Sequence, residues 1–126
     1  MKNNLVLLLV VISPFLLIFC LVFANDQHQN LLHEKMLVEF PVNPETREDF
    51  IAALQEILVD TRAFEGCLSV TTWTNEEDKD KVWLYEEWED RAHQKKYLNW
   101  RTETGNTSHL GAFITGPVRF LWLNEH

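Results

Sequence analysis

Stretches with strand and helix periodicity alternate along this chain in an order compatible with few folds. Residues 35–42, KMLVEFPV, carry an apolar side chain at every even-numbered position, which predicts a strand with one firmly buried face. Residues 67–74 and 82–88, CLSVTTWT and VWLYEEW, are rich in β-branched and aromatic residues, which predicts two further strands. The charged residues 75–81 between them form a turn, so these two strands should pair as a hairpin.

Two other stretches have helical character. The first begins at Asn43 and Pro44, an N-cap followed by proline at the first helical position, and continues with apolar residues three and four positions apart. The second covers residues 90–104 and stops at a glycine. Residues 108–115 are compatible with a further short helix, and residues 118–123, VRFLWL, predict a last strand.

The resulting order is β-α-β-β-α-β, the split pattern of ferredoxin-like α+β folds. In these folds two helices cover one face of a four-stranded antiparallel sheet. The predicted hairpin strands are nevertheless apolar on both sides, since Trp83 and Tyr85 lie opposite Leu84 and Trp88. Two helices can cover only one of these faces, so we expect the other face to pack against a second copy in a two-fold homodimer.

Residues 5–24 contain no charge, and twenty apolar residues are about the length that crosses a hydrocarbon core. This length favours a retained transmembrane helix, whereas residues 22–24, VFA, resemble a signal peptidase site, and both alternatives stay open. Lys2 is the only flanking cation, so the positive-inside rule sends the rest of the chain across the membrane. We therefore expect a signal peptide or N-terminal membrane anchor (1–24), a polar tether (25–34) and one extracytoplasmic domain (35–124). The domain would be periplasmic or secreted, or anchored in the inner membrane.

Charge and residue spacing exclude several classes of function. The net charge of −8 disfavours nucleic acid and anionic lipid surfaces as partners. Cys67 is the only cysteine outside the apolar segment, so the domain has no internal disulfide. The five histidines show no pair at ligand spacing within one element, and neither CxxC, GxGxxG nor a phosphate loop occurs. We therefore expect no metal and no cofactor.

Several short motifs carry a family resemblance. Residues 65–67, EGC, precede the second strand, Glu86-x-Trp88 closes the third, and residues 89–93 open a helix with Tyr97-Leu98 one turn later. These motifs are similar to those of the antibiotic biosynthesis monooxygenase family, over about residues 35–124. The resemblance implies a dimeric α/β barrel in which two sheets face each other. Val38 stands where the haem-degrading branch has asparagine, which disfavours that branch.

The resemblance also implies an activity, because several family members oxidise quinols or polycyclic phenols with molecular oxygen and without flavin, haem or metal. Such a reaction needs a base, a donor for the developing anion, and flat apolar walls. On a regular helix from Asp90, the side chains of His93, Tyr97 and Arg101 fall on one side. His93 could be the base, or a solvated capping residue, and Tyr97 and Arg101 could be the donors.

The expected substrate-binding residues surround the same space. Glu86 points to the same face as Leu84 and Trp88, where it should find a partner such as Arg101, and it could also act as an acid or base. The predicted set is Glu86, Trp88, Trp100, Val38 and Phe113, although large aromatic side chains are also typical of plain core packing. The leading hypothesis is an exported cofactor-independent monooxygenase. The alternatives are a non-catalytic dimer that binds a small aromatic ligand, and a small isomerase or lyase.

Overall fold

The computed structural model describes residues 33–126. The predicted signal peptide or transmembrane anchor (1–24) and almost all of the predicted tether (25–34) lie outside the described residues. Between residues 33 and 126, no helix combines the length and apolarity needed to span a bilayer.

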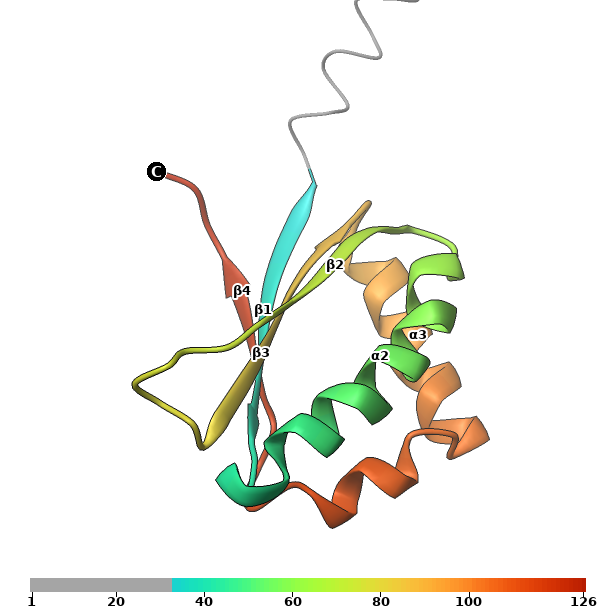
Figure 1. Cartoon of the computed structure of the whole chain (residues 1–126). Coiled ribbons are helices and arrows are strands. Elements are labelled where there is room, and N and C mark those ends of the chain that lie inside the picture. The colour runs from blue at the N-terminus through green and yellow to red at the C-terminus, as the bar shows by residue number, and fades with distance from the viewer. Residues whose placement is uncertain (1–32) are drawn as a thin grey trace, which may run out of the picture. The chain divides into compact units, whose positions relative to one another are not determined.

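The elements of the described part follow the predicted order (Figure 1). They are β1 (Glu34–Pro41), the 3₁₀ helix η1 (Pro44–Thr46), α2 (Arg47–Ala63), β2 (Cys67–Trp73), β3 (Lys81–Trp88), α3 (Arg91–Thr104), the 3₁₀ helix η2 (Ser108–Ala112) and β4 (Arg119–Leu123). The β-α-β-β-α-β arrangement predicted from periodicity is confirmed.

The four strands form one antiparallel sheet in the order β2-β3-β1-β4. Val38 in the central strand β1 pairs with Leu84 on one side and with Phe120 on the other, so these three side chains share a face. Figure 1 shows α2 and α3 on one side of the sheet, and no element of residues 33–126 covers the opposite side. The predicted four-stranded sheet with two helices on one face is therefore confirmed.

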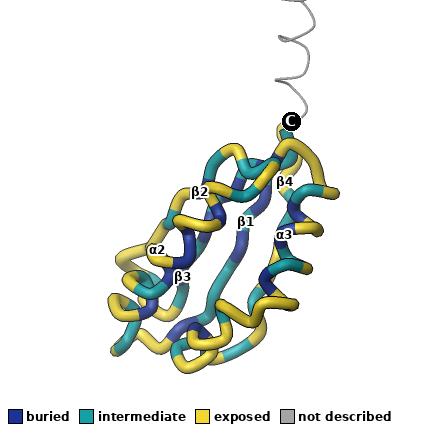
Figure 2. The backbone as a smooth tube through the Cα atoms, turned by 90° about the vertical axis from the view of Figure 1, so that its right-hand side faces the viewer, coloured by how far each residue is buried: buried dark blue, intermediate teal, exposed yellow. Residues whose placement is uncertain are grey.

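The core lies between the sheet and the helices. In β3 the side chains alternate strictly between buried and half-buried, which puts every second residue on the helix-facing side. Helix α2 buries residues three or four positions apart, as the apolar stripe predicted. Figure 2 shows the buried positions of the strands and of α3 facing one another. The largest fully buried side chains are Trp88, Phe50, Met36, Leu58 and Val38.

Caps and glycines set the ends of the helices. The Asn43 side chain accepts a hydrogen bond from the Glu45 backbone N–H at 3.0 Å, in agreement with the predicted cap. Gly105 ends α3 in the left-handed conformation, with φ of 61°. Gly66, before β2, also has a positive φ of 83°, and a Cβ atom at this position would overlap the side chain of His93. Only glycine satisfies both conditions at position 66.

The outer face of the sheet is rich in apolar and aromatic side chains. Trp73 is 58% exposed, and Trp83 and Tyr85 are half-buried beside it on β3. Charged groups bridge part of this face, where Glu39 accepts a hydrogen bond from the Trp83 indole at 3.1 Å and pairs with Arg119 at 3.3 Å. The second apolar face inferred from the strand pattern is therefore present and uncovered within residues 33–126.

Candidate active site

A cavity of about 350 Å³ lies between the inner face of the sheet and the helices. This volume is within the range of small-molecule sites. The walls come from β1, β3 and β4, from α2 and α3, and from η2 and the residues that follow it. They are mostly apolar and include Phe40, Leu54, Leu58, Leu84, Leu110 and Ile114. Aliphatic walls with few polar groups suit a flat apolar ligand held by a small number of hydrogen bonds.

Glu86 places a carboxyl group on this apolar wall. Strand alternation turns it inward together with Leu84 and Trp88, and it is only 4% exposed. Its Oε2 accepts a hydrogen bond from the Trp88 indole N–H at 2.8 Å, whereas its Oε1 has no hydrogen-bond partner among residues 33–126. Because no fully enclosed side-chain oxygen in this part of the chain lacks a partner, Oε1 must be accessible from the cavity.

The environment of Glu86 also changes its basicity. Burial raises the pKa of its carboxyl group above the ordinary value, and the hydrogen bond from Trp88 opposes this shift only in part. The expected partner Arg101 does not pair with Glu86, since its guanidinium is turned toward α2 instead. Glu86 is therefore a buried carboxyl without a cationic partner in the described residues, and its carboxylate is a stronger base than an exposed glutamate.

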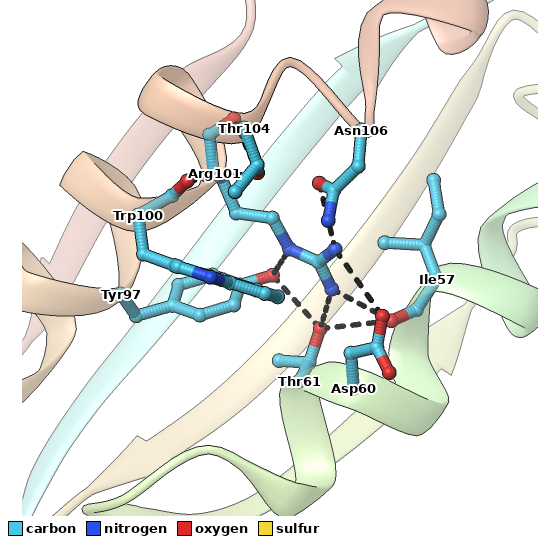
Figure 3. Close-up of polar contacts among 8 residues, drawn as sticks. All are labelled: Ile57, Asp60, Thr61, Tyr97, Trp100, Arg101, Thr104 and Asn106. Atoms are coloured by element: carbon cyan, nitrogen blue, oxygen red, sulfur yellow. Dashed lines mark hydrogen bonds and ion pairs between the residues drawn. The ribbon is translucent and has the colours of Figure 1, made fainter.

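Arg101 lines the cavity, but its nitrogens are bonded within the protein (Figure 3). Its Nε donates to the Tyr97 hydroxyl at 3.0 Å, and its Nη2 donates to the Ile57 carbonyl at 2.7 Å and to Thr61 Oγ1 at 3.1 Å. Its Nη1 faces the side-chain oxygens of Asn106 at 3.0 Å and Asp60 at 3.8 Å. The guanidinium thus ties α3 to α2, and each of its nitrogens already has a protein partner.

The Tyr97 hydroxyl is part of the same network. It accepts from Arg101 and lies 2.8 Å from Thr61 Oγ1. Either hydroxyl can donate in this contact, because Thr61 Oγ1 also lies 3.4 Å from the Ile57 carbonyl and can donate there instead. Its ring lines the cavity and packs on Trp88 with centroids 5.2 Å apart. Tyr97 and Arg101 are brought to the cavity as predicted, but their polar atoms are engaged by the protein.

His93 lies outside the cavity. Its backbone N–H and its Nδ1 contact Asp90 Oδ1 at 2.8 and 2.9 Å, and its Nε2 is 3.8 Å from Glu89. Its side chain also packs against Gly66, at the start of β2. The structure therefore gives His93 the position of a residue in the helix cap and does not bring it to the predicted reaction site.

Of the predicted substrate-binding residues, Val38 and Glu86 line the cavity, and three aromatic residues do not. Trp88 is fully buried behind Glu86. Trp100 lies in a separate surface groove with Phe64, and Phe113 packs on Phe50 in the core with centroids 6.1 Å apart. The cavity therefore has aliphatic and phenyl walls, and none of the three indole or phenyl groups expected to line or fill it does so.

Gln94 is a buried polar cavity residue that sequence reasoning missed. It is 5% exposed and lines the cavity together with Tyr97, Leu98 and Arg101. These positions follow the helical spacing i, i+3, i+4 and i+7, so they form one stripe of α3. The predicted inward-facing stripe began at His93, whereas the observed stripe begins one residue later, at Gln94. The signal in the sequence was Leu98, the apolar residue that only this phase of the helix turns inward.

Comparisons with known proteins agree with this fold. The fold defines a ferredoxin-like α+β domain with a ligand-sized space between sheet and helices. The family model described as "Antibiotic biosynthesis monooxygenase" matches residues 35–103, and the chain belongs to this family. A comparison with curated proteins gave no match.

Solved structures show the same fold at low sequence identity. A conserved protein from Methanosarcina mazei Go1 superposes with a TM-score of 0.68 and 16% identity, over 79% of this chain and 99% of that one. A crystal structure of an antibiotic biosynthesis monooxygenase superposes with a TM-score of 0.64 and 18% identity, over 74% of this chain and 98% of that one. Rv0793 from Mycobacterium tuberculosis superposes with a TM-score of 0.62 and 21% identity, over 75% of this chain and 95% of that one. The family and fold are thereby established.

Proposed function

We propose that this protein is a cofactor-independent monooxygenase that oxidises a quinol or polycyclic phenol with molecular oxygen, and that Glu86 is its base. The observation that carries the proposal is the free Oε1 of Glu86 on the wall of an apolar cavity of ligand size. Membership of the monooxygenase family supports the reaction class. The raised pKa of the carboxyl group supports the choice of Glu86, because a general base is most effective when its pKa approaches the working pH.

The reaction balances without an external reductant. Glu86 takes the phenolic proton, and the electron-rich phenolate reduces O₂ by one electron before the two radicals combine at a ring carbon. The peroxide formed there takes up the proton held by Glu86. Loss of the C–H proton from that carbon and cleavage of the O–O bond then leave a second carbonyl group and one water. In sum, a phenol and O₂ give a quinone and H₂O.

Tyr97 and Arg101 act as positioning residues in this scheme. Their polar atoms bond to Thr61 and Ile57 and hold α3 at a fixed distance from α2. The ring of Tyr97 and the aliphatic part of the Arg101 side chain then form part of the cavity wall. Preorganised walls that exclude water favour the formation of a buried phenolate next to a carboxyl group.

Dimerisation and export belong to the same proposal. The half-buried Trp83 and Tyr85 and the exposed Trp73 support a homodimer through the outer face of the sheet. The uncharged residues 5–24 support an extracytoplasmic location. Sedimentation of the purified protein at micromolar concentration tests the first point, and a monomer would contradict it. Fractionation of cells that express the tagged chain tests the second point.

Oxygen uptake by the purified protein, without added metal or flavin, tests the activity. We expect turnover with at least one member of a panel of hydroquinones, naphthols and anthrones. Glu86→Gln should lower turnover by at least about tenfold, the low end for loss of a general base. The control is Glu89→Gln, which makes the same chemical change at a half-exposed carboxylate outside the cavity. Saturable quenching of protein fluorescence without any uptake would instead favour a ligand-binding dimer.

A further inference from the structure

We infer that Gln94 selects the substrate by a hydrogen bond to a second oxygen substituent, so that the preferred ligand is an uncharged aromatic ring system with two oxygen functions. This inference rests on the proposed function only in taking the cavity as the substrate site. It assigns Gln94 as a specificity residue, distinct from the base Glu86.

The hydrogen bonds of Gln94 carry the inference. Its side chain is 5% exposed and lines the cavity, and its amide makes no hydrogen bond to any group of residues 33–126. The other buried polar side chains of this region are bonded: Thr61 and Arg101 to each other, and Glu86 to Trp88. No fully enclosed side-chain nitrogen or oxygen of residues 33–126 lacks a partner, so the unbonded amide atoms of Gln94 must be accessible, as Oε1 of Glu86 is. The missing partner of Gln94 therefore belongs in the cavity.

Glu86 and Gln94 thus face the cavity from different elements, and its largely apolar wall also includes Thr107 and Ser108. Glu86 on β3 offers an oxygen that accepts a hydroxyl hydrogen, and Gln94 on α3 offers both an amide donor and a carbonyl acceptor. Gln94 can therefore pair with either a hydroxyl or a carbonyl oxygen. This property suits a ligand that carries either a hydroxyl or a carbonyl as its second oxygen.

The charge of the cavity wall further restricts the class of ligand that can bind. The one cationic side chain on its wall, Arg101, has each of its nitrogens bonded within the protein. A carboxylate or sulfonate in this space would find no free cation among the described lining residues and would face the carboxyl group of Glu86. The cavity should therefore reject anionic aromatics and retain neutral ones.

Anaerobic titrations of the full-length protein with naphthalene derivatives test the inference, with quenching of protein fluorescence as the readout. The probes are 1-naphthol, the 1,4-, 1,5- and 2,6-dihydroxynaphthalenes, and 1-hydroxy-2-naphthoate. We expect the best diol to bind wild type at least about tenfold more tightly than 1-naphthol, because a site built to bond an oxygen discriminates against ligands that lack it. The naphthoate should bind more weakly than 1-naphthol.

Gln94→Leu should reduce this diol preference to about twofold or less and leave the affinity for 1-naphthol unchanged or higher. Asn99→Leu is the matched control, because Asn99 lies on the same helix in the outer groove, and this variant should keep the wild-type ratio. Gln94→Met serves if the leucine variant fails to fold, as judged by circular dichroism. A diol preference that persists in both Gln94 variants overturns the inference. So does the lack of any preference in wild type, or the failure of every diol to bind.

The two proposals fail separately. If 1-naphthol is oxidised in a Glu86-dependent way while Gln94→Leu keeps the diol preference, the specificity role falls and the proposed activity stands. If the preference disappears in Gln94→Leu while no probe supports oxygen uptake, the specificity role stands and the activity falls.

Discussion

Trp88 donates its indole N–H to Oε2 of Glu86 over 2.8 Å, and both side chains are buried. The bond fixes the carboxyl group and occupies one of its oxygens, which leaves the other for the cavity. A carboxyl held in this way by a neutral donor keeps the raised pKa that burial produces, because no cation among residues 33–126 compensates its charge.

The stability of the protein should therefore depend on pH through Glu86. Its pKa is raised above the ordinary value of 4.5 in the folded state, so the folded protein binds this proton more tightly than the unfolded chain. The contribution of Glu86 to the free energy of unfolding is complete below that value and is lost as pH rises through the folded pKa. Glu86→Gln removes this loss, so its stability relative to wild type should be greater at pH 8 than at pH 4. Urea denaturation at pH 4 and pH 8 measures the free energy of unfolding of both proteins. A difference between them that is the same at both pH values would contradict the expectation.

His93→Ala distinguishes the two candidates for the base. His93 contacts Asp90 and Glu89 outside the cavity, so its removal should leave oxygen uptake within about twofold of wild type. A loss of about tenfold or more, typical of a general acid or base, would restore His93 to the reaction. Thermal unfolding of the same variant serves as the control for a loss of folded protein.

Arg101→Ala should destabilise the fold strongly. The change removes a buried side chain that bonds both helices, so the Ile57 carbonyl and the Thr61 hydroxyl each lose a charge-assisted donor. We expect a loss of about 3 kcal/mol in the free energy of unfolding, as for other buried polar networks. Arg91→Ala is the control: this arginine is 54% exposed in its pair with Glu34, so its loss should cost about 1 kcal/mol or less. An equal loss in the free energy of unfolding for the two substitutions would contradict this expectation.

The hydroxyl groups of Tyr97 and Thr61 should be energetically coupled. They share a buried hydrogen bond of 2.8 Å, and each also contacts Arg101. Tyr97→Phe and Thr61→Val should each lower the free energy of unfolding by about 1–2 kcal/mol. Combined in one chain, they should cost less than the sum by at least about 0.5 kcal/mol. Strict additivity in urea unfolding would show that the bond contributes nothing.

Substitution of two glycines separates backbone strain from steric overlap. Gly66 and Gly105 both have positive φ, but only at Gly66 would a new Cβ overlap a neighbour, the side chain of His93. Gly105→Ala should therefore cost about 1 kcal/mol, from strain alone. Gly66→Ala should cost clearly more, about 2–4 kcal/mol. The midpoint of thermal unfolding provides the comparison, and similar values for both variants would mean that His93 moves aside freely.

Periodicity sufficed to predict the fold because each element carries its own signal. The even-numbered residues of β1, the apolar spacing in α2 and the Asn43 cap each define one element without reference to the others. Their order then leaves one simple arrangement of helices over a sheet. Strand alternation also placed Glu86 and Val38 on the inner face, where the cavity is found.

Side-chain partners could not be predicted in the same way. A shift of one residue along a helix turns a side chain by about 100°, enough to replace Gln94 with His93 on the predicted inner stripe. The partner of Glu86 proved to be Trp88, two positions along the same strand, whose indole N–H occupies one carboxyl oxygen without compensating the charge. Likewise, the turn of Arg101 toward α2 depends on carbonyl and hydroxyl groups that sequence spacing does not position.

The guanidinium of Arg101 bonds α3 to the Ile57 carbonyl and the Thr61 hydroxyl of α2 beside the cavity. A ligand that entered by parting the two helices would first have to break buried charge-assisted bonds. Phe120 of β4 borders the cavity and is 47% exposed, so we expect ligands to enter beside it. We expect the residues around Phe120 to control the rates of ligand association and dissociation. The affinity should instead depend on the cavity wall that Arg101 holds in place.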